Sequence, residues 1–498
     1  MKDYEIVLTA DRSFMSEYHL LPFLKGLRFA SVSILNPSLF FSFVGPQVPK
    51  TGEGRAAWAP YHSRRTEAAL IDYGFNESQI AVVTPDDVAD FLGPRTKILS
   101  ITVRDPLSRV HHYSLLNPMR RESYSSLSFK KIVSHLPRRK LDFRVVAEGP
   151  GAWQLSDLED RRRFGIDHVI VGEDITEVVP QLFEAIIKRE TMPELMYAAS
   201  RDSSKVPLVK GGVIEGLIEV ASGCNRSCRF CAVSRLQCRG LRDIIAETKA
   251  NVRYGQHCIT LRSDDILNYG SKDIRVNREA VRNLYESVSN VQGVTRVSQC
   301  YLNLASAVSE PSLINEISQI IGVGCEEYPY TTAFVGIETG SSRLVDECML
   351  GKARPFKPQE WADVVEKGFS ICDENLWVPL GMFVLGFPSE TEKDVDETMA
   401  LVERLRAYKS ILIPFLFESK GTLSKEASYG IKNMMPCHLE LVSEILDHNA
   451  FWGKCLIKEQ VRNLSIPRWL LPFISPFIDW SIRRTCHRLM DEAIASTS

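Results

Sequence analysis

Apolar runs and amphipathic stretches alternate along the first two hundred residues. Short runs rich in β-branched residues predict strands at 4–9, 80–84, 97–103, 143–147 and 167–171. Amphipathic stretches between them predict helices at 66–73, 86–92 and 127–136. Repeated strand–helix units of this length favour a parallel sheet with right-handed crossovers. We therefore predict an N-terminal Rossmann-like α/β domain over residues 1–195.

A polar, turn-rich stretch over residues 190–212 predicts a linker, after which the alternation resumes. The second series of apolar runs predicts strands at 214–220, 258–261, 294–298, 334–337, 381–386 and 411–417. Six such units make an open or partial (β/α)6 barrel the expected architecture for residues 205–430. From residue 432 onward the pattern is helical, so we predict a small helical C-terminal region over 431–498.

Two largely apolar stretches require a membrane test. Residues 29–49 carry no charge, but Asn36, Pro37 and Pro46 interrupt the run, so a spanning helix is not expected. Residues 466–480 are apolar and contain three prolines, with Trp469 and Trp480 inside and arginines following. This segment suits either peripheral contact with a membrane surface or a pair of helices packed on the protein, and we favour the packed helices.

Composition narrows the class of protein. A chain of 498 residues is long enough for about three domains. Its 60 basic and 62 acidic residues leave a net charge of −2, which excludes a protein that mainly wraps nucleic acid without sequence preference. The N-terminus has acidic residues within its apolar segment, so we interpret it as a first strand rather than a signal peptide.

The cysteines are distributed unevenly. None of the twelve precedes Cys224, and three then occur within eight residues, as Cys224-x-x-x-Cys228-x-x-Cys231. A secreted disulfide protein does not crowd cysteines in this way, so the pattern indicates a metal or cluster site in a reducing compartment, with the cytoplasm as the expected location.

Three thiolates on one short loop can hold three irons of a four-iron cluster and leave the fourth iron open to a substrate. Phe230, just before the third cysteine, is suited to cover such a cluster with an apolar face. The alternative is a structural zinc site with Cys238 as the fourth ligand, although the spacing lacks the paired knuckles common in such sites.

The spacing, the aromatic residue before the third cysteine and the preceding strand resemble the radical S-adenosylmethionine superfamily. The resemblance implies that Cys224, Cys228 and Cys231 bind a 4Fe-4S cluster whose open iron chelates S-adenosylmethionine. It further implies reductive cleavage to a 5′-deoxyadenosyl radical, which abstracts hydrogen from carbon, and an external electron donor such as a ferredoxin or flavodoxin. The cofactors carry that chemistry, while the protein supplies position, electrostatics and exclusion of water.

Later segments extend the resemblance at the ends of predicted strands. The segment 261–265 resembles the family's contact with the methionyl amine, and it contributes Ser263, Asp264 and Asp265. The segment 334–341 resembles the family's glycine-containing strand beside the adenosine, and it contributes Gly336, Glu338 and Ser341. The segment 381–391 resembles the family's strand–turn motif. Each segment alone is weak evidence, but their order along the chain favours the radical enzyme.

The N-terminal domain resembles that of the subgroup with a cobalamin-binding-like domain, in an archaeal-type branch. The similar segments are 145–153 and 166–173, and they place Gly149 and Gly151 where cobalamin would approach the backbone. The loop after the first strand, 9–14, lacks the histidine that commonly ligates cobalt in such domains. Either cobalamin binds without a histidine ligand, or the domain has kept the fold and lost the cofactor.

The leading hypothesis is therefore a radical enzyme that modifies an unactivated carbon, with methyl transfer if cobalamin is present. One alternative is a tRNA methylthiotransferase, but such enzymes carry N-terminal cysteines for an auxiliary cluster, and nucleic acid is not the expected partner here. Another alternative is a non-catalytic zinc-binding scaffold. The expected substrate is a small molecule or a lipid, and no residue is assigned to act on it.

Overall fold

The computed structural model describes residues 2–18, 22–33, 35–111, 115, 117, 121–172, 174–198 and 206–462. The segment 466–480 and the arginines after it lie outside these residues. The chain divides into two compact units. Unit 1 comprises residues 1–110, 119–218 and 242–259, and unit 2 comprises the remainder.

Unit 1 contains a six-stranded parallel sheet in the order β3-β1-β4-β5-β6-β7. Its strands are β1 (Ile6–Ala10), β3 (Ile80–Val82), β4 (Ile98–Thr102), β5 (Arg144–Glu148), β6 (His168–Val171) and β7 (Leu195–Tyr197). The predicted Rossmann-like sheet is thus confirmed. The linker prediction was wrong at β7, because Leu195–Tyr197 pair with Val169–Val171 and extend the sheet.

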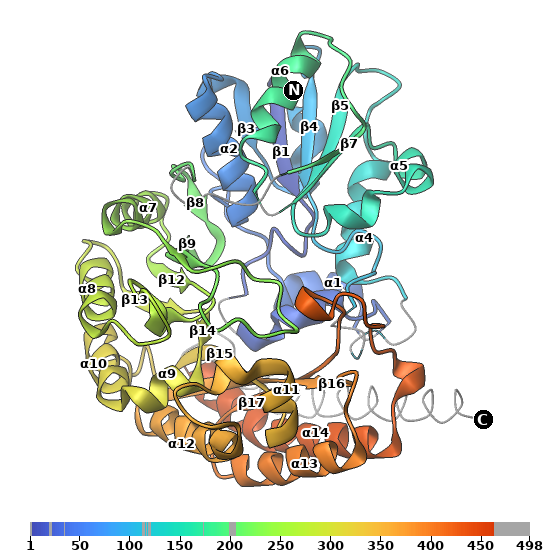
Figure 1. Ribbon diagram of the computed structural model, residues 1–498. Helices are drawn as coiled ribbons and strands as arrows, with labels where there is room; N and C mark the ends of the chain where they lie inside the picture. Colours follow the sequence, from blue (N-terminus) through green and yellow to red (C-terminus); the bar gives the residue numbers. More distant parts are fainter. Residues whose placement is uncertain are drawn as a thin grey trace. The chain divides into compact units, whose positions relative to one another are not determined.

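Helices cover both faces of this sheet, which explains why β1 and β4 are buried along their whole length. One core lies under α2 (Tyr61–Tyr73) and α6 (Val178–Ile187). The other lies under α3 (Val88–Phe91) and α4 (Tyr124–Ser134) (Figure 1). The end of α2 is as predicted, since Gly74 adopts the left-handed conformation there with φ 119°.

Two further parts of unit 1 come from distant segments. The short helix η1 (Pro22–Phe29) precedes the uncharged stretch, which contains α1 (Pro37–Leu39) and η2 (Phe40–Val44). Phe40 stacks on Tyr124 with ring centroids 3.8 Å apart, so this stretch packs on the protein. The second part is a strand pair, β2 (Trp58–Ala59) with β8 (Gly212–Val213), beside α7 (Leu241–Arg253).

The second half of the chain forms the strands of the predicted partial barrel. They lie in two sheets, ordered β13-β12-β9 and β14-β15-β16-β17. The strands are β9 (Leu217–Glu219), β12 (Cys258–Arg262), β13 (Arg296–Gln299), β14 (Tyr301–Leu302), β15 (Thr331–Glu338), β16 (Trp377–Leu385) and β17 (Ile411–Leu416). The second sheet is parallel throughout.

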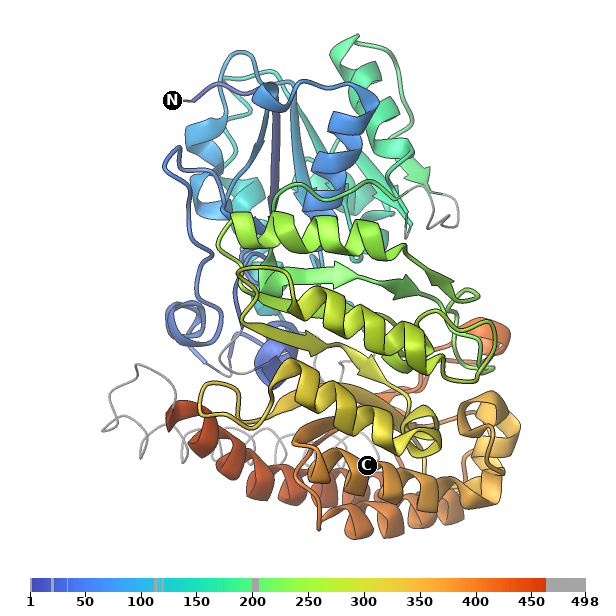
Figure 2. The same ribbon diagram turned by 90° about the vertical axis from the view of Figure 1, so that its left-hand side faces the viewer.

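Helices form the outer layer of unit 2, outside its strands (Figures 1 and 2). They are α8 (Arg278–Ser289), α9 (Leu304–Ser309), α10 (Pro311–Ile321), α11 (Ser342–Ala353), α12 (Trp361–Glu374), α13 (Glu392–Leu405) and α14 (Pro436–Arg462). This arrangement confirms the predicted α/β architecture. The described part of the C-terminal region is helical, as expected.

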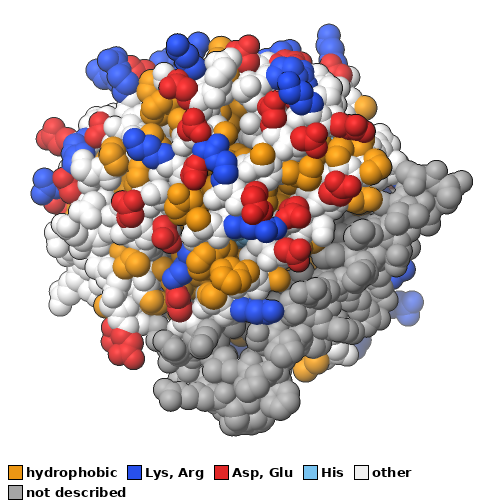
Figure 3. Space-filling model, turned by 90° about the horizontal axis from the view of Figure 1, so that it is seen from below, with side chains coloured by type: hydrophobic (Ala, Val, Ile, Leu, Met, Phe, Trp, Pro, Cys, Tyr) orange, Lys and Arg blue, Asp and Glu red, His pale blue; other side chains and the backbone are white. Residues whose placement is uncertain are grey.

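Acidic and basic side chains are interspersed on the face of unit 2 seen in Figure 3, with apolar side chains between them. Ion pairs also join the helices of unit 2, with Arg404 of α13 paired to Asp363 of α12, and Arg406, just after α13, paired to Glu444 of α14. Within the described residues, no helix is both long enough and apolar enough to span a bilayer.

Candidate functional site

The three clustered cysteines lie in one loop of unit 2 that a small hairpin closes. Strand β10 (Ala221–Ser222) pairs antiparallel with β11 (Gln237–Cys238), and the loop between them contains the motif. The backbone N–H of Cys224 donates to the carbonyl of Ser234 over 2.9 Å. The N–H of Cys231 donates to the carbonyl of Cys228 over 3.1 Å, which forms a tight turn. The chain therefore presents all three thiols from a single folded loop.

The thiols share one electrostatic environment. Burial raises the pKa of the Cys228 thiol to about 11, and the positive charge of Lys352 opposes this effect. The Cys224 thiol also has a raised pKa, again chiefly because of burial. Cys224 and Cys231 each act on the pKa of Cys228, so the three sulfurs are close enough to influence one another. A metal that binds here must therefore displace the thiol protons.

Arg226, inside the motif, is a residue that our sequence analysis missed. Its Nη1 donates to the carbonyls of Gly351 (3.1 Å), Lys352 (2.9 Å) and Arg354 (2.7 Å) at the end of α11. Its Nη2 donates to Ser306 Oγ over 2.8 Å, and its side chain is 2% exposed. The buried guanidinium thus fastens the cysteine loop to α11. Its position between two cysteines was the only signal in the sequence.

The residues predicted beside the methionyl amine follow β12, as expected, but they have different surroundings. Asp264 accepts a hydrogen bond from the N–H of Gly223 over 2.7 Å, next to the cysteine loop. Asp265 is buried and accepts from Ser306 Oγ (2.7 Å) and Asn268 Nδ2 (2.6 Å). Ser263 is buried, and its Oγ has no hydrogen-bond partner within the described residues. Of the three, Ser263 has a buried side-chain oxygen without a hydrogen-bond partner among the described residues.

The residues predicted beside the adenosine form two separate groups. Glu338 ends β15 at a bulge, in the left-handed region with φ 67°. Its Oε1 accepts from Lys352 Nζ over 2.6 Å, and both side chains are largely buried. A Cβ on Gly336 would lie 2.2 Å from that oxygen and 2.4 Å from that nitrogen. Gly336 therefore leaves the space that the ion pair fills, and Lys352 is a second residue that the sequence analysis missed.

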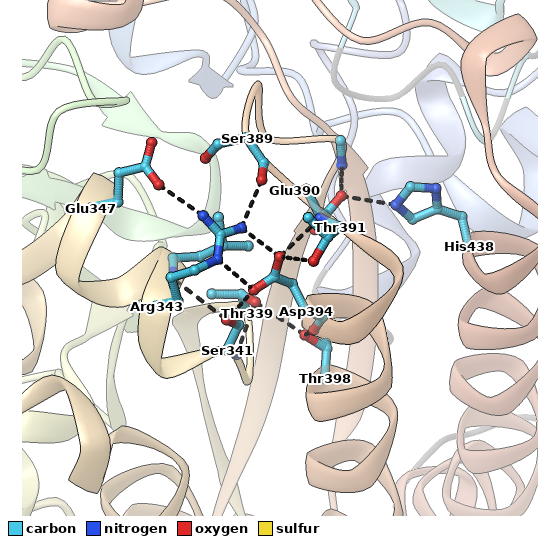
Figure 4. A network of polar contacts seen from close by, with 12 residues as sticks. Thr339, Ser341, Arg343, Glu347, Ser389, Glu390, Thr391, Asp394, Thr398 and His438 are labelled. Atoms are coloured by element: carbon cyan, nitrogen blue, oxygen red, sulfur yellow. Dashed lines mark hydrogen bonds and ion pairs between the residues drawn. The ribbon is translucent and has the colours of Figure 1, made fainter.

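Ser341 belongs to a neighbouring network at the start of α11 (Figure 4). It is the N-cap residue of α11, and its Oγ donates to Asp394 Oδ1 over 2.5 Å. Arg343 Nε donates to the same oxygen over 3.2 Å. Burial opposes ionisation of Asp394, but hydrogen bonds from Arg343, Ser341 and Thr391 hold its pKa well below the usual range. This network joins α11 to α13 and accounts for Ser341 by structure alone.

Beside this network, Glu390 follows the segment that resembles the family's strand–turn motif. Its Oε2 accepts from the N–H of Gly386 over 2.6 Å and lies 2.8 Å from His438 Nε2 (Figure 4). Gly386 has φ 82°, and a Cβ there would overlap the ring of Tyr429. The turn after β16 is thus held against the start of α14 by a buried carboxylate–imidazole pair.

An aromatic cluster and a short strap cover the third cysteine. Phe230 packs edge-on against Phe387 with ring centroids 5.6 Å apart, as expected for an apolar cover. The strap is η11 (Gly421–Leu423), where Thr422 N donates to the carbonyl of Arg229 over 2.9 Å. Gly421 has φ 60°, and a Cβ there would lie 2.5 Å from the carbonyl oxygen of Cys231. The close approach requires glycine.

In unit 1, the predicted cobalamin glycines are packed against protein. Gly149 has φ 102°, and a Cβ there would lie 2.9 Å from the Thr102 side chain. A Cβ on Gly151 would lie 2.3 Å from the carbonyl oxygen of Arg104. The adjacent Glu148 is buried, and burial raises its pKa to about 7. Close packing on the segment after β4 thus explains both glycines without a ligand.

No group of three or more His, Cys, Asp and Glu side chains in the described part of the chain is arranged around a single-ion site. The Sγ of Cys238, the fourth ligand of the zinc alternative, instead accepts a hydrogen bond from the N–H of Gly270 over 3.2 Å.

Comparisons with known proteins agree with the motif, although no family model matches the chain. The chain is 25% identical over 252 residues to tRNA-2-methylthio-N(6)-dimethylallyladenosine synthase from Thermobifida fusca, covering 49% of this chain and 47% of the relative. It is also 25% identical over 268 residues to the enzyme of that name from Clostridium botulinum, covering 53% and 56%. The chain thus spans about half the length of these curated relatives.

The solved structures that it resembles include two of TsrM from Kitasatospora setae, a radical S-adenosylmethionine methyltransferase. One of them, with cobalamin and a [4Fe-4S] cluster bound, matches with a TM-score of 0.50 at 13% identity, covering 83% of this chain and 72% of that chain. Another, with tryptophan substrate and an S-adenosylmethionine analogue bound, matches with the same TM-score at 14% identity, covering 82% and 73%. This likeness shows the fold, including the N-terminal parallel sheet.

The cysteine loop between β10 and β11 and the strands of the partial barrel therefore belong to a chain that is similar in sequence to these tRNA-modifying synthases and similar in fold to a radical S-adenosylmethionine methyltransferase.

Proposed function

We propose that this protein is a radical S-adenosylmethionine enzyme that modifies an unactivated carbon of its substrate. The observation that carries the proposal is the single loop that presents Cys224, Cys228 and Cys231 beside the cation of Lys352. When bound there by the three cysteines, a reduced 4Fe-4S cluster supplies the electron that cleaves S-adenosylmethionine.

The protein's own residues have complementary roles in this proposal. Arg226 holds the cysteine loop on α11, and Phe230 with Phe387 limits the access of water to the third cysteine. Ser263 has a buried hydroxyl free to hydrogen-bond the amino acid part of the cosubstrate. Asp264, which holds the N–H of Gly223, orients the start of the loop. Exclusion of water matters because it strengthens each of these electrostatic contacts.

The test is anaerobic reconstitution of the full chain with iron and sulfide, followed by S-adenosylmethionine and a reductant. We expect brown protein with about four irons per chain and release of 5′-deoxyadenosine. Cys224→Ala, Cys228→Ala and Cys231→Ala should each lose iron and this product, whereas Cys325→Ala, at an exposed cysteine elsewhere in unit 2, should keep both. Zinc without iron in the wild-type protein would instead support the scaffold alternative.

Cobalamin is the proposed second cofactor, and methyl transfer is the reaction that would accompany it. The support is the likeness to TsrM, which holds cobalamin, over 83% of this chain. Hydroxocobalamin added to the reconstituted protein should then remain bound during gel filtration, and the protein peak should show its visible absorption bands. A protein peak without those bands would show that the domain has kept the fold without the cofactor.

A second candidate function is methylthio transfer to tRNA, favoured by the names of the curated relatives. The absence of cysteines before Cys224 counts against it. Mass spectrometry of nucleosides from tRNA incubated with the reduced protein distinguishes the two. A methylthio-modified adenosine would replace the leading proposal with this one.

A further inference from the structure

The cysteine loop rests on the C-terminal end of α11. Three carbonyls of that end, those of Gly351, Lys352 and Arg354, accept from Arg226. The N–H of Arg229 donates to the carbonyl of Cys348 over 2.8 Å. A Cβ on Gly351 would lie 1.6 Å from the carbonyl oxygen of Arg226, so the two backbones are in direct contact. The loop and the helix end therefore form one packed unit.

This location creates an electrostatic problem. A helix C-terminus carries a partial negative charge, and three thiolates add more negative charge beside it. Arg226 offsets part of this charge, but its Nη atoms are already committed to the helix carbonyls and to Ser306. An anionic cluster at this site needs a further cation that is not screened by solvent.

Lys352 meets that requirement. It lies one residue beyond the backbone contact at Gly351, and its side chain is 14% exposed. Its Nζ lies over Gly336 of β15, 2.6 Å from Glu338 Oε1, which fixes the position of the charge. The backbone carbonyl of Lys352 also accepts from Arg226, which lies between Cys224 and Cys228, so the lysine belongs to the helix end that contacts the cysteine loop.

We propose that Lys352 is a positioning residue that raises the reduction potential of the cluster, and that Glu338 holds it in place and partly offsets its charge. The inference rests on the proposed function, because it needs a cluster on the three cysteines. Reduction adds one electron to the cluster, supplied by the external donor, and a nearby fixed positive charge stabilises the product of that step. Net charge near the sulfurs is one of the factors that set such potentials.

The experiment measures the midpoint potential of the reconstituted cluster in the full chain by anaerobic titration followed by electron paramagnetic resonance. Lys352→Gln should make the potential more negative, and Lys352→Arg should leave it close to the wild-type value. Glu338→Gln should shift it in the opposite direction, to more positive values, because the cation loses its counterion. Lys420→Gln is the matched control, since this lysine is half-exposed next to the strap and solvent screens its charge.

Opposite shifts in Lys352→Gln and Glu338→Gln support the proposal, because damage to the fold would not change sign between them. Equal potentials in both variants and the wild type, or shifts of the same sign, would overturn it while leaving the cluster and the proposed function intact. Should Lys352→Gln fail to take up iron, Glu338→Gln and Lys352→Arg still decide the outcome. A wild-type protein without a cluster would overturn both proposals.

Discussion

The buried carboxyl of Glu148 makes the stability of unit 1 depend on pH. Its Oε1 accepts from Thr102, and its Oε2 has no hydrogen-bond partner within the described residues. Burial raises the pKa of this carboxyl from its ordinary value of 4.5 to about 7, so the folded state binds its proton more tightly than the unfolded state. The stability that the protonated carboxyl contributes is complete at pH values below its pKa in the unfolded chain. It is lost as the pH rises through about 7, its pKa in the folded protein.

We therefore expect Glu148→Gln to flatten the pH dependence of stability between about pH 4.5 and 7. The slope that disappears corresponds to a free energy of unfolding on the order of 3 kcal/mol. Urea unfolding at several pH values, followed by circular dichroism, measures it. Glu159→Gln, at an exposed carboxyl of the same unit, should keep the wild-type slope. An unchanged slope in Glu148→Gln would show that the carboxyl titrates normally in the folded protein.

Arg226 is important for stability because its removal would leave several buried polar groups without their hydrogen-bond or charge partner. Arg226→Ala would leave three carbonyls at the end of α11 and the nearby Asp265 without its guanidinium. Removing one partner of a buried charged network costs about 3–5 kcal/mol, so we expect a clear fall in the thermal midpoint of unit 2. Arg226→Lys should rescue little of it, because one ammonium cannot reach all three carbonyls.

Arg229 provides the comparison, since it is an exposed arginine of the same loop whose Nη1 donates to the carbonyl of Glu347 over 3.1 Å. Arg229→Ala should lower the thermal midpoint only slightly. Differential scanning calorimetry of the three variants tests this difference. A similar loss of stability at both arginines would mean that charge, rather than the buried contacts, is what the loop requires.

Among the elements, the strap η11 decides how closely the chain covers Cys231. Gly421→Ala places a Cβ against the carbonyl oxygens of Cys231 and Arg229 and must also adopt a positive φ. We expect the strap to shift and the reconstituted protein to hold less iron, with a faster loss of the cluster in air. Iron content and the decay of visible absorbance measure these effects.

Gly430→Ala is the matched control for the strap, because no heavy atom lies within 4 Å of a Cβ at that position. It should load and retain iron like the wild type. Equal retention in Gly421→Ala would show that the strap does not contribute to protection of the cluster.

At the level of the whole molecule, the compact units do not follow the linear order of the chain. Unit 1 includes residues 242–259, which follow the cysteine motif in sequence. Arg64 Nε donates to the carbonyl of Gly212 over 2.9 Å, and Trp58 Nε1 donates to the carbonyl of Tyr254 over 2.9 Å. Both contacts tie the start of unit 1 to segments beyond residue 205.

A fragment of residues 1–198 should therefore be less stable than a fragment of residues 1–260. The shorter fragment keeps the six-stranded sheet but leaves the buried Arg64 without its partner at Gly212. We expect a lower midpoint of urea unfolding, by a margin well above experimental error. Identical midpoints would mean that residues 199–260 contribute nothing to the stability of unit 1.

Strand alternation, the cysteine motif and the cover by Phe230 were all readable from local patterns. Hydrophobic periodicity and short spacings are properties of neighbouring residues, so they survive in the linear chain. Strand β7 escaped detection because three residues in a polar stretch carry little periodic signal, and only pairing with β6 makes them a strand.

The surroundings of the cysteines depend on residues far apart in the chain. Lys352 reaches the motif because α11 ends against the cysteine loop, and Asp265 is occupied because Ser306 and Asn268 fold around it. The spacing of these residues in the sequence does not predict such contacts, since they arise from the way strands and helices pack. The amino-acid order thus determined the class of fold and predicted a ligand set, whereas packing assigned the polar groups around the cysteines their partners and their charge environment.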